Sequence, residues 1–281
     1  MKENDAKSKS EKYYSVSACW YEQIDEIYAQ LERVSAAQIP DILRLRKLTR
    51  IMSVHSSTAI EGNALTLGQV AAVVNGKKVA GLPNDIKEVQ NAWQAYGEVG
   101  AYNPWSVADL LKAHALMTAG LVEEAGAFRA VNVSVVDDRG EVLHRGSPPE
   151  IVAEAVGELL AWGKDANAHP LVKSSAVHCV LEHIHPFRDG NGRVGRLWQS
   201  AILTQWNPLF AYLPIERAVH DHQERYYLAL LESQRGESVN ASPFIGFMLD
   251  AISNSLDKFM MVAAVDEIDS TLSSKRAVKN G

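Results

Sequence analysis

The residues most able to do chemistry lie in one short stretch, Ile184 to Arg196, which reads IHPFRDGNGRVGR. It holds a histidine that titrates near neutral pH, a single carboxylate, a glycine-rich turn and two arginines. Histidine can take a proton from an attacking hydroxyl, and arginine can grip phosphate oxygens bidentately. One carboxylate suits a Mg²⁺ ion that is shared with the phosphates of a nucleotide. The stretch therefore predicts phosphate handling with a general base.

The elements on either side must position these groups. Apolar residues at helical spacing predict a helix over Val172 to Ile184. Pro186 disfavours helical geometry at His185, so this helix should end there. A second amphipathic helix is expected to start near Arg193. The glycine turn then lies at a helix N-terminus, where free N–H groups and the helix dipole attract an anion.

Other interpretations of the stretch need to be weighed. Gly190 to Gly195 fits the GxGxxG dinucleotide fingerprint, but that motif follows a strand, and a helix is expected here. His178, His183 and His185 could suggest zinc, yet their spacing does not put two of them on one helical face as in HExxH. A plain turn, a structural histidine and two solvent-facing arginines would each be ordinary alone. Their combination within twelve residues favours phosphate chemistry.

The segment HPFRDGNGRVGR resembles the signature of the Fic family, HPFx[DE]GN[GK]RxxR, at every fixed position, and we call Ile184 to Arg196 the signature stretch. The resemblance implies a mostly helical fold and transfer of a nucleoside monophosphate, usually AMP from ATP, onto a protein hydroxyl. On the matching positions, His185 would deprotonate a Ser, Thr or Tyr of the target protein, and Asp189 would hold Mg²⁺. The phosphates would be bound by Gly190, Asn191 and Gly192 as an anion hole, by Arg193, and by Arg196 at the γ-phosphate.

A second motif lies upstream, at the end of a helix that is expected from about residue 40. Gly62 is a natural stop for this helix, so Glu61 lies in the last turn, where the dipole disfavours negative charge by about 0.3–1 kcal/mol. A cationic partner elsewhere would explain it, and an exposed glutamate without a role is the alternative. SxxxEG resembles the inhibitory motif [ST]xxxE[GN] of many Fic proteins. The resemblance implies that Glu61 pairs with Arg196 and that Ser57 is the matching hydroxyl.

Residues 126–144 carry the one clear β pattern. Alternating valines, a DDRG turn and a returning EVLH segment predict a hairpin, which must lean on the helices because an isolated hairpin is only marginally stable. In Fic proteins a hairpin at this place is the flap over the active site, and its edge would hold the target segment by strand addition. A purely structural hairpin is the alternative. The edge residues are Val142, Leu143 and His144.

After the signature stretch, a helix is expected over His220 to Gln234. Its adjacent tyrosines, Tyr226 and Tyr227, point to different faces, so one of them should belong to the core. The resemblance places Tyr227 and Gln234 where the family contacts adenine, with simple packing as the alternative. A last helix is expected over Pro243 to Ile268, followed by a polar, lysine-rich tail.

Composition limits the function classes. The chain has 281 residues, 47% of them hydrophobic, which suffices for one large core or two modest domains. A formal net charge of −6 argues against non-specific nucleic-acid binding. Cys19 and Cys179 lie in apolar helical contexts and are expected to be buried thiols. No apolar run approaches the ~20 residues that span a membrane, and the polar N-terminus lacks a secretory signal, so a cytoplasmic protein is expected.

The sequence therefore predicts an all-α fold with one small β-hairpin flap. We expect an N-terminal helical region with the inhibitory motif over residues 1–105, a Fic core over 106–236, and a C-terminal helix and tail over 237–281. The implied function is a self-inhibited protein adenylyltransferase that uses ATP and Mg²⁺ on a target protein or on itself. Hydrolysis of the AMP–protein bond with Glu61 orienting water, and a non-catalytic nucleotide-sensing module, stay open. The target, the nucleotide preference and the oligomeric state, a homodimer included, cannot be read from the sequence.

Overall fold

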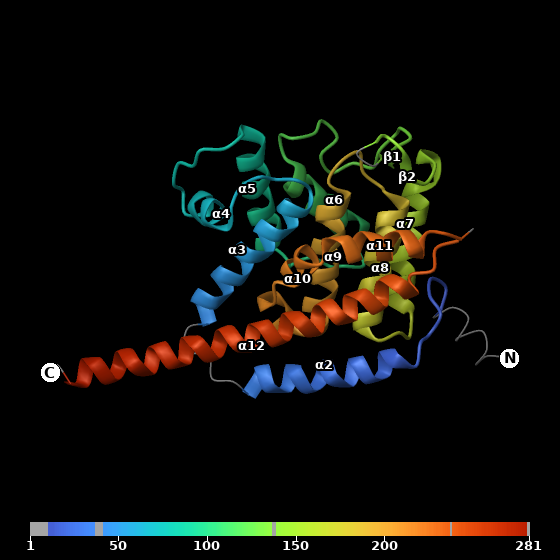
Figure 1. The fold of residues 1–281 in the computed structure, drawn as a ribbon. Coiled ribbons are helices and arrows are strands. Elements are labelled where there is room, and N and C mark those ends of the chain that lie inside the picture. Colours follow the sequence, from blue (N-terminus) through green and yellow to red (C-terminus); the bar gives the residue numbers. More distant parts are fainter. Residues whose placement is uncertain (1–10, 37–41, 137–138, 237, 280–281) are drawn as a thin grey trace.

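Helices make up most of the regular structure (Figure 1). The computed structural model describes residues 11–36, 42–136, 139–236 and 238–279. Within these ranges the one sheet has two strands, which confirms the all-α class with a small hairpin. The elements are α2 (Cys19–Ala36), α3 (Ile42–Ile60), α4 (Leu67–Val74), α5 (Pro83–Gly97), α6 (Val107–Thr118), β1 (Ser134–Val136), β2 (Val142–Arg145), α7 (Pro149–Asp165), α8 (Pro170–Ile184), α9 (Asn191–Trp206), the 3-10 helix η1 (Pro208–Tyr212), α10 (Ile215–Asp221), α11 (Gln223–Ser233) and α12 (Ser242–Lys279).

Helices α8 and α9 form the centre of the bundle. Most residues of both helices are buried on all sides, as expected for helices that neighbours surround. Helices α7 and α12 pack on α8, while α6 and η1 pack on α9. The signature stretch runs from the end of α8 into the first turn of α9. Both of its ends are therefore anchored in the most deeply buried part of the molecule.

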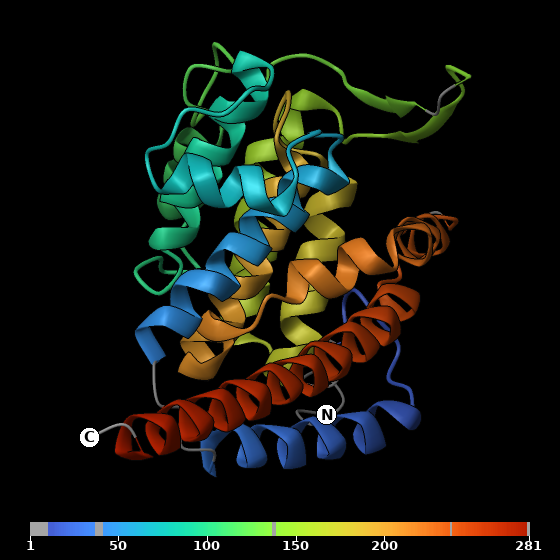
Figure 2. The ribbon, with the colours of Figure 1, turned by 60° about the vertical axis from the view of Figure 1, so that its left-hand side comes forward.

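Helix α3 lies across one side of this bundle, in contact with α4, α5, α10 and α9 (Figure 2). It ends at Ile60, and Gly62 follows with a φ of 90°, in the left-handed region that glycine adopts readily. Glycine stops the helix there, as predicted. Glu61 is thereby held at the point where α3 meets the rest of the bundle.

Helix α2 lies alongside α12 on another side of the bundle (Figure 1). One continuous cluster of buried side chains runs from Tyr14, just before α2, to Phe259 in α12. The division into segments 1–105, 106–236 and 237–281 stays a prediction. Among the described residues, none of the helices combines the length and the hydropathy that crossing a membrane requires.

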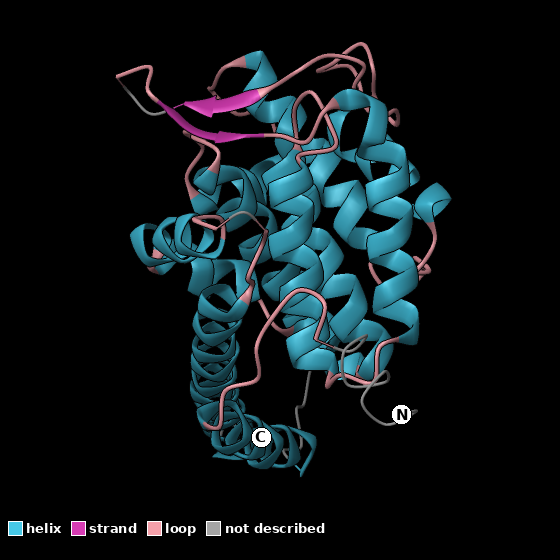
Figure 3. Ribbon diagram, turned by 90° about the vertical axis from the view of Figure 1, so that its right-hand side faces the viewer, coloured by secondary structure: helices cyan, strands magenta, loops and turns pink. Residues whose placement is uncertain are grey.

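Strands β1 and β2 form an antiparallel hairpin that projects from one end of the helices (Figure 3). Ser134 pairs with Arg145 and Val135 with His144, and the register shifts at Val136. The strands are shorter than the valine alternation suggests. The carbonyl of Val131 accepts a hydrogen bond from a side chain instead of a strand partner.

Three expectations about individual elements are wrong. The helix expected over His220 to Gln234 is two helices, because the chain leaves helical geometry at His222, with φ −129° and ψ 38°. The expected tail is helical as far as Lys279, because no glycine or proline interrupts the chain after Gly246 until residue 281. Cys19 is exposed, since it lies beside the buried stripe that starts at Trp20.

Candidate active site

The signature stretch is braced from within by Asn191. Its side-chain Oδ1 accepts the backbone N–H of Phe187 at 2.8 Å, and its Nδ2 donates to the carbonyl of Phe187 at 2.9 Å. The Phe187 ring is buried and stacks on His114 with ring centroids 3.8 Å apart. His114 Nδ1 accepts the N–H of Gly126, so its Nε2 donates to the carbonyl of Asp189, at 3.0 Å. The turn is therefore fixed at both of its sides.

His185 ends α8 in a left-handed conformation, with φ 52°, the one described non-glycine residue that has a positive φ. Its Nδ1 lies 3.3 Å from the carbonyl of Glu182, and since a carbonyl only accepts, Nδ1 carries the proton. The other ring nitrogen, Nε2, is then left as an acceptor. Burial lowers the pKa of His185 to about 4, so the ring is neutral at pH 7. The side chain can therefore accept a proton there.

Helix α9 begins at Asn191 after Gly190, whose φ is 86°, and no side chain caps its first turn. The amides of this turn are available to an anion. Asp189 Oδ1 accepts the N–H of Gly190 at 2.6 Å and a donor of Arg193 at 3.1 Å. Its carboxylate is 56% exposed, and Oδ2 makes no hydrogen bond or ion pair with the described residues. One open carboxylate oxygen beside a phosphate site fits the way proteins bind Mg²⁺.

Both arginines of the stretch are buried, so the solvent-facing alternative is wrong. Arg193 lies 3.1 Å from Asp189 and 3.2 Å from Glu88 of α5. Arg196 donates through Nε to the Ser57 hydroxyl at 3.1 Å and through Nη2 to the Ser57 carbonyl at 2.9 Å. Residues from three helices thus meet at the first turns of α9.

Glu61 lies 2.6 Å from Nη2 of Arg196. Burial alone would lower the pKa of Arg196, but the carboxylate of Glu61 outweighs it and the pKa is raised. A side chain at Gly192 would collide with the Glu61 carboxylate, so this carboxylate lies directly over the first turn of α9. The dipole of α3 disfavours the charge of Glu61, but Arg196 and the N-terminus of α9 stabilise it.

The hairpin contacts the end of α8 through His144. His144 Nε2 lies 2.7 Å from the carbonyl of His183, and its ring centroid is 6.5 Å from that of His185. Val142 and Leu143 are about half exposed on the same strand. The strand predicted as a docking edge therefore passes beside His185.

Tyr226 is buried and Tyr227 is half exposed, which confirms that one of the two belongs to the core. The Tyr227 hydroxyl donates to the carbonyl of Ile60, 3.3 Å away, at the end of α3. Gln234 lies two turns further on, as the C-cap of α11, and its side chain makes no hydrogen bond to the described residues. The structure therefore brings Tyr227, but not Gln234, to the end of α3.

Two charged residues near His185 were not predicted from the sequence. Glu182, in α8, is 11% exposed and lies 3.8 Å from His178, and the desolvation of its carboxyl raises its pKa to about 8. A lone acid in the otherwise apolar end of α8 could have indicated it. Arg129 donates to the carbonyl of His185 at 2.7 Å. No periodicity marks Arg129, because its partners are backbone atoms.

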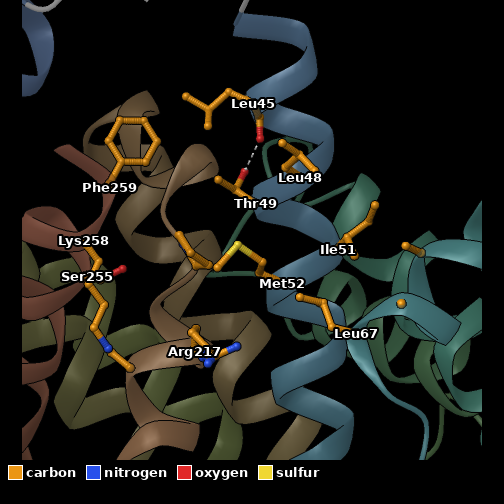
Figure 4. Close-up of a pocket in the computed structure, with 14 residues that line it drawn as sticks. Leu45, Leu48, Thr49, Ile51, Met52, Leu67, Arg217, Ser255, Lys258 and Phe259 are labelled. Carbon is orange, nitrogen blue, oxygen red and sulfur yellow. Dashed lines mark hydrogen bonds between the residues drawn. The ribbon is translucent and has the colours of Figure 1, made fainter. Parts of the chain in front are cut away.

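Other candidate sites do not coincide with this centre. A cavity of about 350 Å³ is lined by residues of α3, α4, α10 and α12, most of them apolar, with Arg217 and Lys258 among them (Figure 4). None of its lining residues belongs to the signature stretch. The dinucleotide interpretation is wrong, because a helix precedes the glycines. In the part of the chain that the structure describes, no cluster of three or more His, Cys, Asp or Glu side chains suits a metal ion.

The chain is similar to known proteins over most of its length. The sequence profile of the Fic/DOC family matches residues 104–203. "Protein adenylyltransferase Fic" of Nematostella vectensis is 27% identical over 255 residues, which are 85% of this chain and 55% of that protein. The protein of the same name from Aedes aegypti is 26% identical over 253 residues, 85% of this chain and 47% of that protein. The chain thus spans about half the length of these curated relatives.

Solved structures show the same fold. A Fic family protein from Desulfovibrio desulfuricans G20 superimposes with a TM-score of 0.84 at 39% identity, covering 89% of this chain and 76% of that one. Fic-1 (residues 134–508) from Caenorhabditis elegans gives a TM-score of 0.71 at 22% identity, covering 88% and 73% of the two chains.

Proposed function

Because this chain belongs to the Fic family, we propose that it is a self-inhibited protein adenylyltransferase, which transfers AMP from ATP to a hydroxyl side chain of a protein. The observation that carries the proposal is the contact of Glu61 with Arg196 over the N-terminus of α9. The Glu61 carboxylate thus covers both Arg196 and the first turn of α9, the two groups that would bind the phosphates of ATP. The names of the curated relatives favour transfer over hydrolysis or simple nucleotide sensing.

In the proposed reaction, the target hydroxyl oxygen attacks the α-phosphorus of ATP. Nε2 of His185 takes the proton of that hydroxyl, since Nδ1 already carries one. The bond from the α-phosphorus to its bridging oxygen breaks, and pyrophosphate leaves. The ring is neutral at pH 7, because burial lowers the pKa of His185, so it is ready to accept the proton.

The first turn of α9 provides the phosphate contacts. The N–H groups at Asn191 and Gly192 would face developing charge at a helix N-terminus, and that of Gly190 would join them on leaving Asp189 Oδ1, to which it donates at 2.6 Å. Arg193 binds the phosphates, and Arg196 binds the γ-phosphate. Asp189 would hold Mg²⁺, which supplies positive charge to the phosphates. Tyr227 and Gln234 lie on one face of α11 and would contact the adenine.

The flap provides the docking edge. Val142, Leu143 and His144 would pair with an extended segment of the target, since β2 is an edge strand whose apolar side chains are exposed. Strand pairing would bring a Ser, Thr or Tyr of that segment beside His185. We place this activity in the cytoplasm, where ATP is available, and fractionation of the native cells tests that placement.

Inhibition follows from competition for one guanidinium. While Glu61 and Ser57 occupy Arg196, this arginine cannot bind the γ-phosphate. ATP would then bind with its α-phosphorus away from the line of attack. An approach of roughly 3–3.5 Å along the right line is needed, and a small misplacement costs about 10²-fold in rate.

The experiment compares wild type, Glu61→Gly and Glu61→Gly/His185→Ala with labelled ATP or CTP and Mg²⁺. We expect Glu61→Gly to label itself or added proteins well above wild type, and the double variant to label nothing. No labelling by Glu61→Gly with either nucleotide refutes the proposal. If wild type instead removes AMP from a modified protein and Glu61→Gly does not, the hydrolase alternative holds.

A further inference from the structure

Arg129, between α6 and the flap, is a buried arginine whose side-chain hydrogen bonds go to backbone carbonyls. The residue is 3% exposed, and it forms no ion pair with the described residues. The guanidinium donates to His185 at 2.7 Å, Val131 at 2.7 Å, Ser147 at 2.5 Å and Ile184 at 3.2 Å. Its own backbone N–H donates to the carbonyl of Pro186 at 3.1 Å.

Two of these carbonyls belong to the end of α8. The last carbonyls of a helix lack intrahelical partners and carry the negative end of its dipole, which favours a cation. His185 is also in a left-handed conformation that a non-glycine residue adopts only when its surroundings hold it. The bond from Arg129 Nε reaches the carbonyl of this same residue. Arg129 therefore fixes the backbone from which the base projects.

The other two carbonyls belong to the two stems of the flap. Val131 lies before β1 and Ser147 lies after β2, and one guanidinium joins both. The N–H of Ser147 in turn donates to Ile184 at 3.1 Å. The fit is tight, because a side chain at Gly146 would stand 2.7 Å from Nη2 of Arg129 and 3.1 Å from Cβ of His185.

We propose that Arg129 is a positioning residue for AMP transfer, which locks the flap that docks the target to the backbone of the base. This inference rests on the proposed function. A target segment paired with β2 is then held at a set distance from His185, because the Arg129 guanidinium bonds both to the flap stems and to the backbone of His185. Lysine cannot replace it, since an ammonium lacks the planar fork that reaches several carbonyls at once.

The charge of Arg129 also acts on the base. The pKa of His185 is lowered chiefly by burial, and further by His144 of the flap and by Arg129. The backbone contact to Glu182 and the charge of Glu61 oppose this and raise it. Removal of Arg129 takes away a nearby cation and loosens the surroundings of the ring, and both effects raise the pKa of His185. A purely structural arginine elsewhere would not have that effect.

The test uses the full chain in the Glu61→Gly background, with Arg129→Met, Arg129→Lys and, as a matched control, Arg225→Met. Arg225 is an exposed arginine of α11 that pairs with Asp250. For both Arg129 variants we expect transfer to fall by about 10²-fold while ATP affinity is unchanged. We expect faster hydrogen exchange at the Ser147 amide in both, and a higher His185 pKa by NMR in Arg129→Met. The control should match its parent in every measurement.

The NMR and exchange measurements do not depend on activity. An unchanged His185 pKa in Arg129→Met together with unchanged Ser147 exchange in both variants overturns the positioning role, whatever the rates are. Loss of ATP binding together with transfer also overturns it. If the Glu61→Gly parent labels no protein, the proposed function fails, while the pKa and exchange data still decide on Arg129. If Arg129→Met does not fold, Arg129→Lys decides through exchange at Ser147.

Discussion

Two buried arginines flank the site, and they are held in opposite ways. Arg129 is bound by backbone carbonyls at the base and flap, whereas Arg196 is bound by a carboxylate and a serine from α3. Backbone carbonyls stay in place as long as the fold does. A carboxylate on another helix can leave, and a phosphate can replace it. Under the proposed function, the side of the site at His185 is therefore built to stay fixed, and the side at Arg196 is built to exchange Glu61 for a phosphate.

The largest expected effect comes from the fixed side. In the Glu61→Gly background, His185→Ala should lower AMP transfer by about 10²–10⁴-fold, the usual contribution of a general base. Nucleotide binding should survive, because the first turn of α9 and its arginines are untouched. Labelling rates and calorimetry with ATP measure the two effects. Undiminished labelling by His185→Ala would remove the base from the mechanism.

The competition between Glu61 and phosphate can be tested by removing the guanidinium of Arg196. Arg196→Ala in the Glu61→Gly background should cancel the gain of about 10²-fold that freeing Arg196 provides. The same change in wild type should do little, because Glu61 already withholds this arginine. Residues in direct contact give such non-additive effects. A double-mutant cycle in which the two changes simply add would contradict the competition between Glu61 and phosphate.

A smaller effect is expected from removing the carboxylate of Asp189. Asp189→Ala should raise the Mg²⁺ concentration needed for half-maximal transfer by at least about tenfold, as for weakened metal sites in general. The ion pair of Asp189 with Arg193 is exposed on the acid's side, so the stability of the fold should change little. Titration of activity with Mg²⁺ measures the first, and urea unfolding the second. An unaltered Mg²⁺ dependence would exclude Asp189 as a ligand.

The smallest expected effect is a pH dependence of stability, which comes from His178 near Arg196 and from His185 near Arg129. Burial, assisted by Arg196, lowers the pKa of His178 to about 3, and burial, assisted by Arg129, lowers that of His185 to about 4. Between pH 6.5 and pH 4 the unfolded chain therefore binds more protons at these residues, so the free energy of unfolding falls as the pH falls. Glu182, with its raised pKa, opposes this in part.

Urea unfolding at pH 7 and pH 5 measures this dependence, and His178→Gln should weaken it. A fold that is equally stable or more stable at pH 5 would show that these rings are not held neutral.

Periodicity in the sequence predicted most helices, and the two motifs predicted that Glu61 and Ser57 lie at Arg196, which the structure shows. The features that were not predicted depend on contacts that leave no pattern in the sequence. Arg129 bonds to backbone atoms up to 56 positions away, which any residue type could supply. The break at His222 depends on how α10 and α11 pack on other helices, and helical spacing alone does not encode it. The burial of Arg193 depends on Glu88 of a distant helix.

Gly192 lies where a single substitution would disturb the contact of Glu61 with Arg196. Its backbone is ordinary helix, so the main chain does not require glycine there. Any side chain at this position would meet the Glu61 carboxylate and the guanidinium of Arg196. Gly192→Ala would thus place a methyl group between the end of α3 and the first turn of α9. Under the proposed function, the inhibitory contact therefore depends on the space at Gly192 as well as on the charge of Glu61.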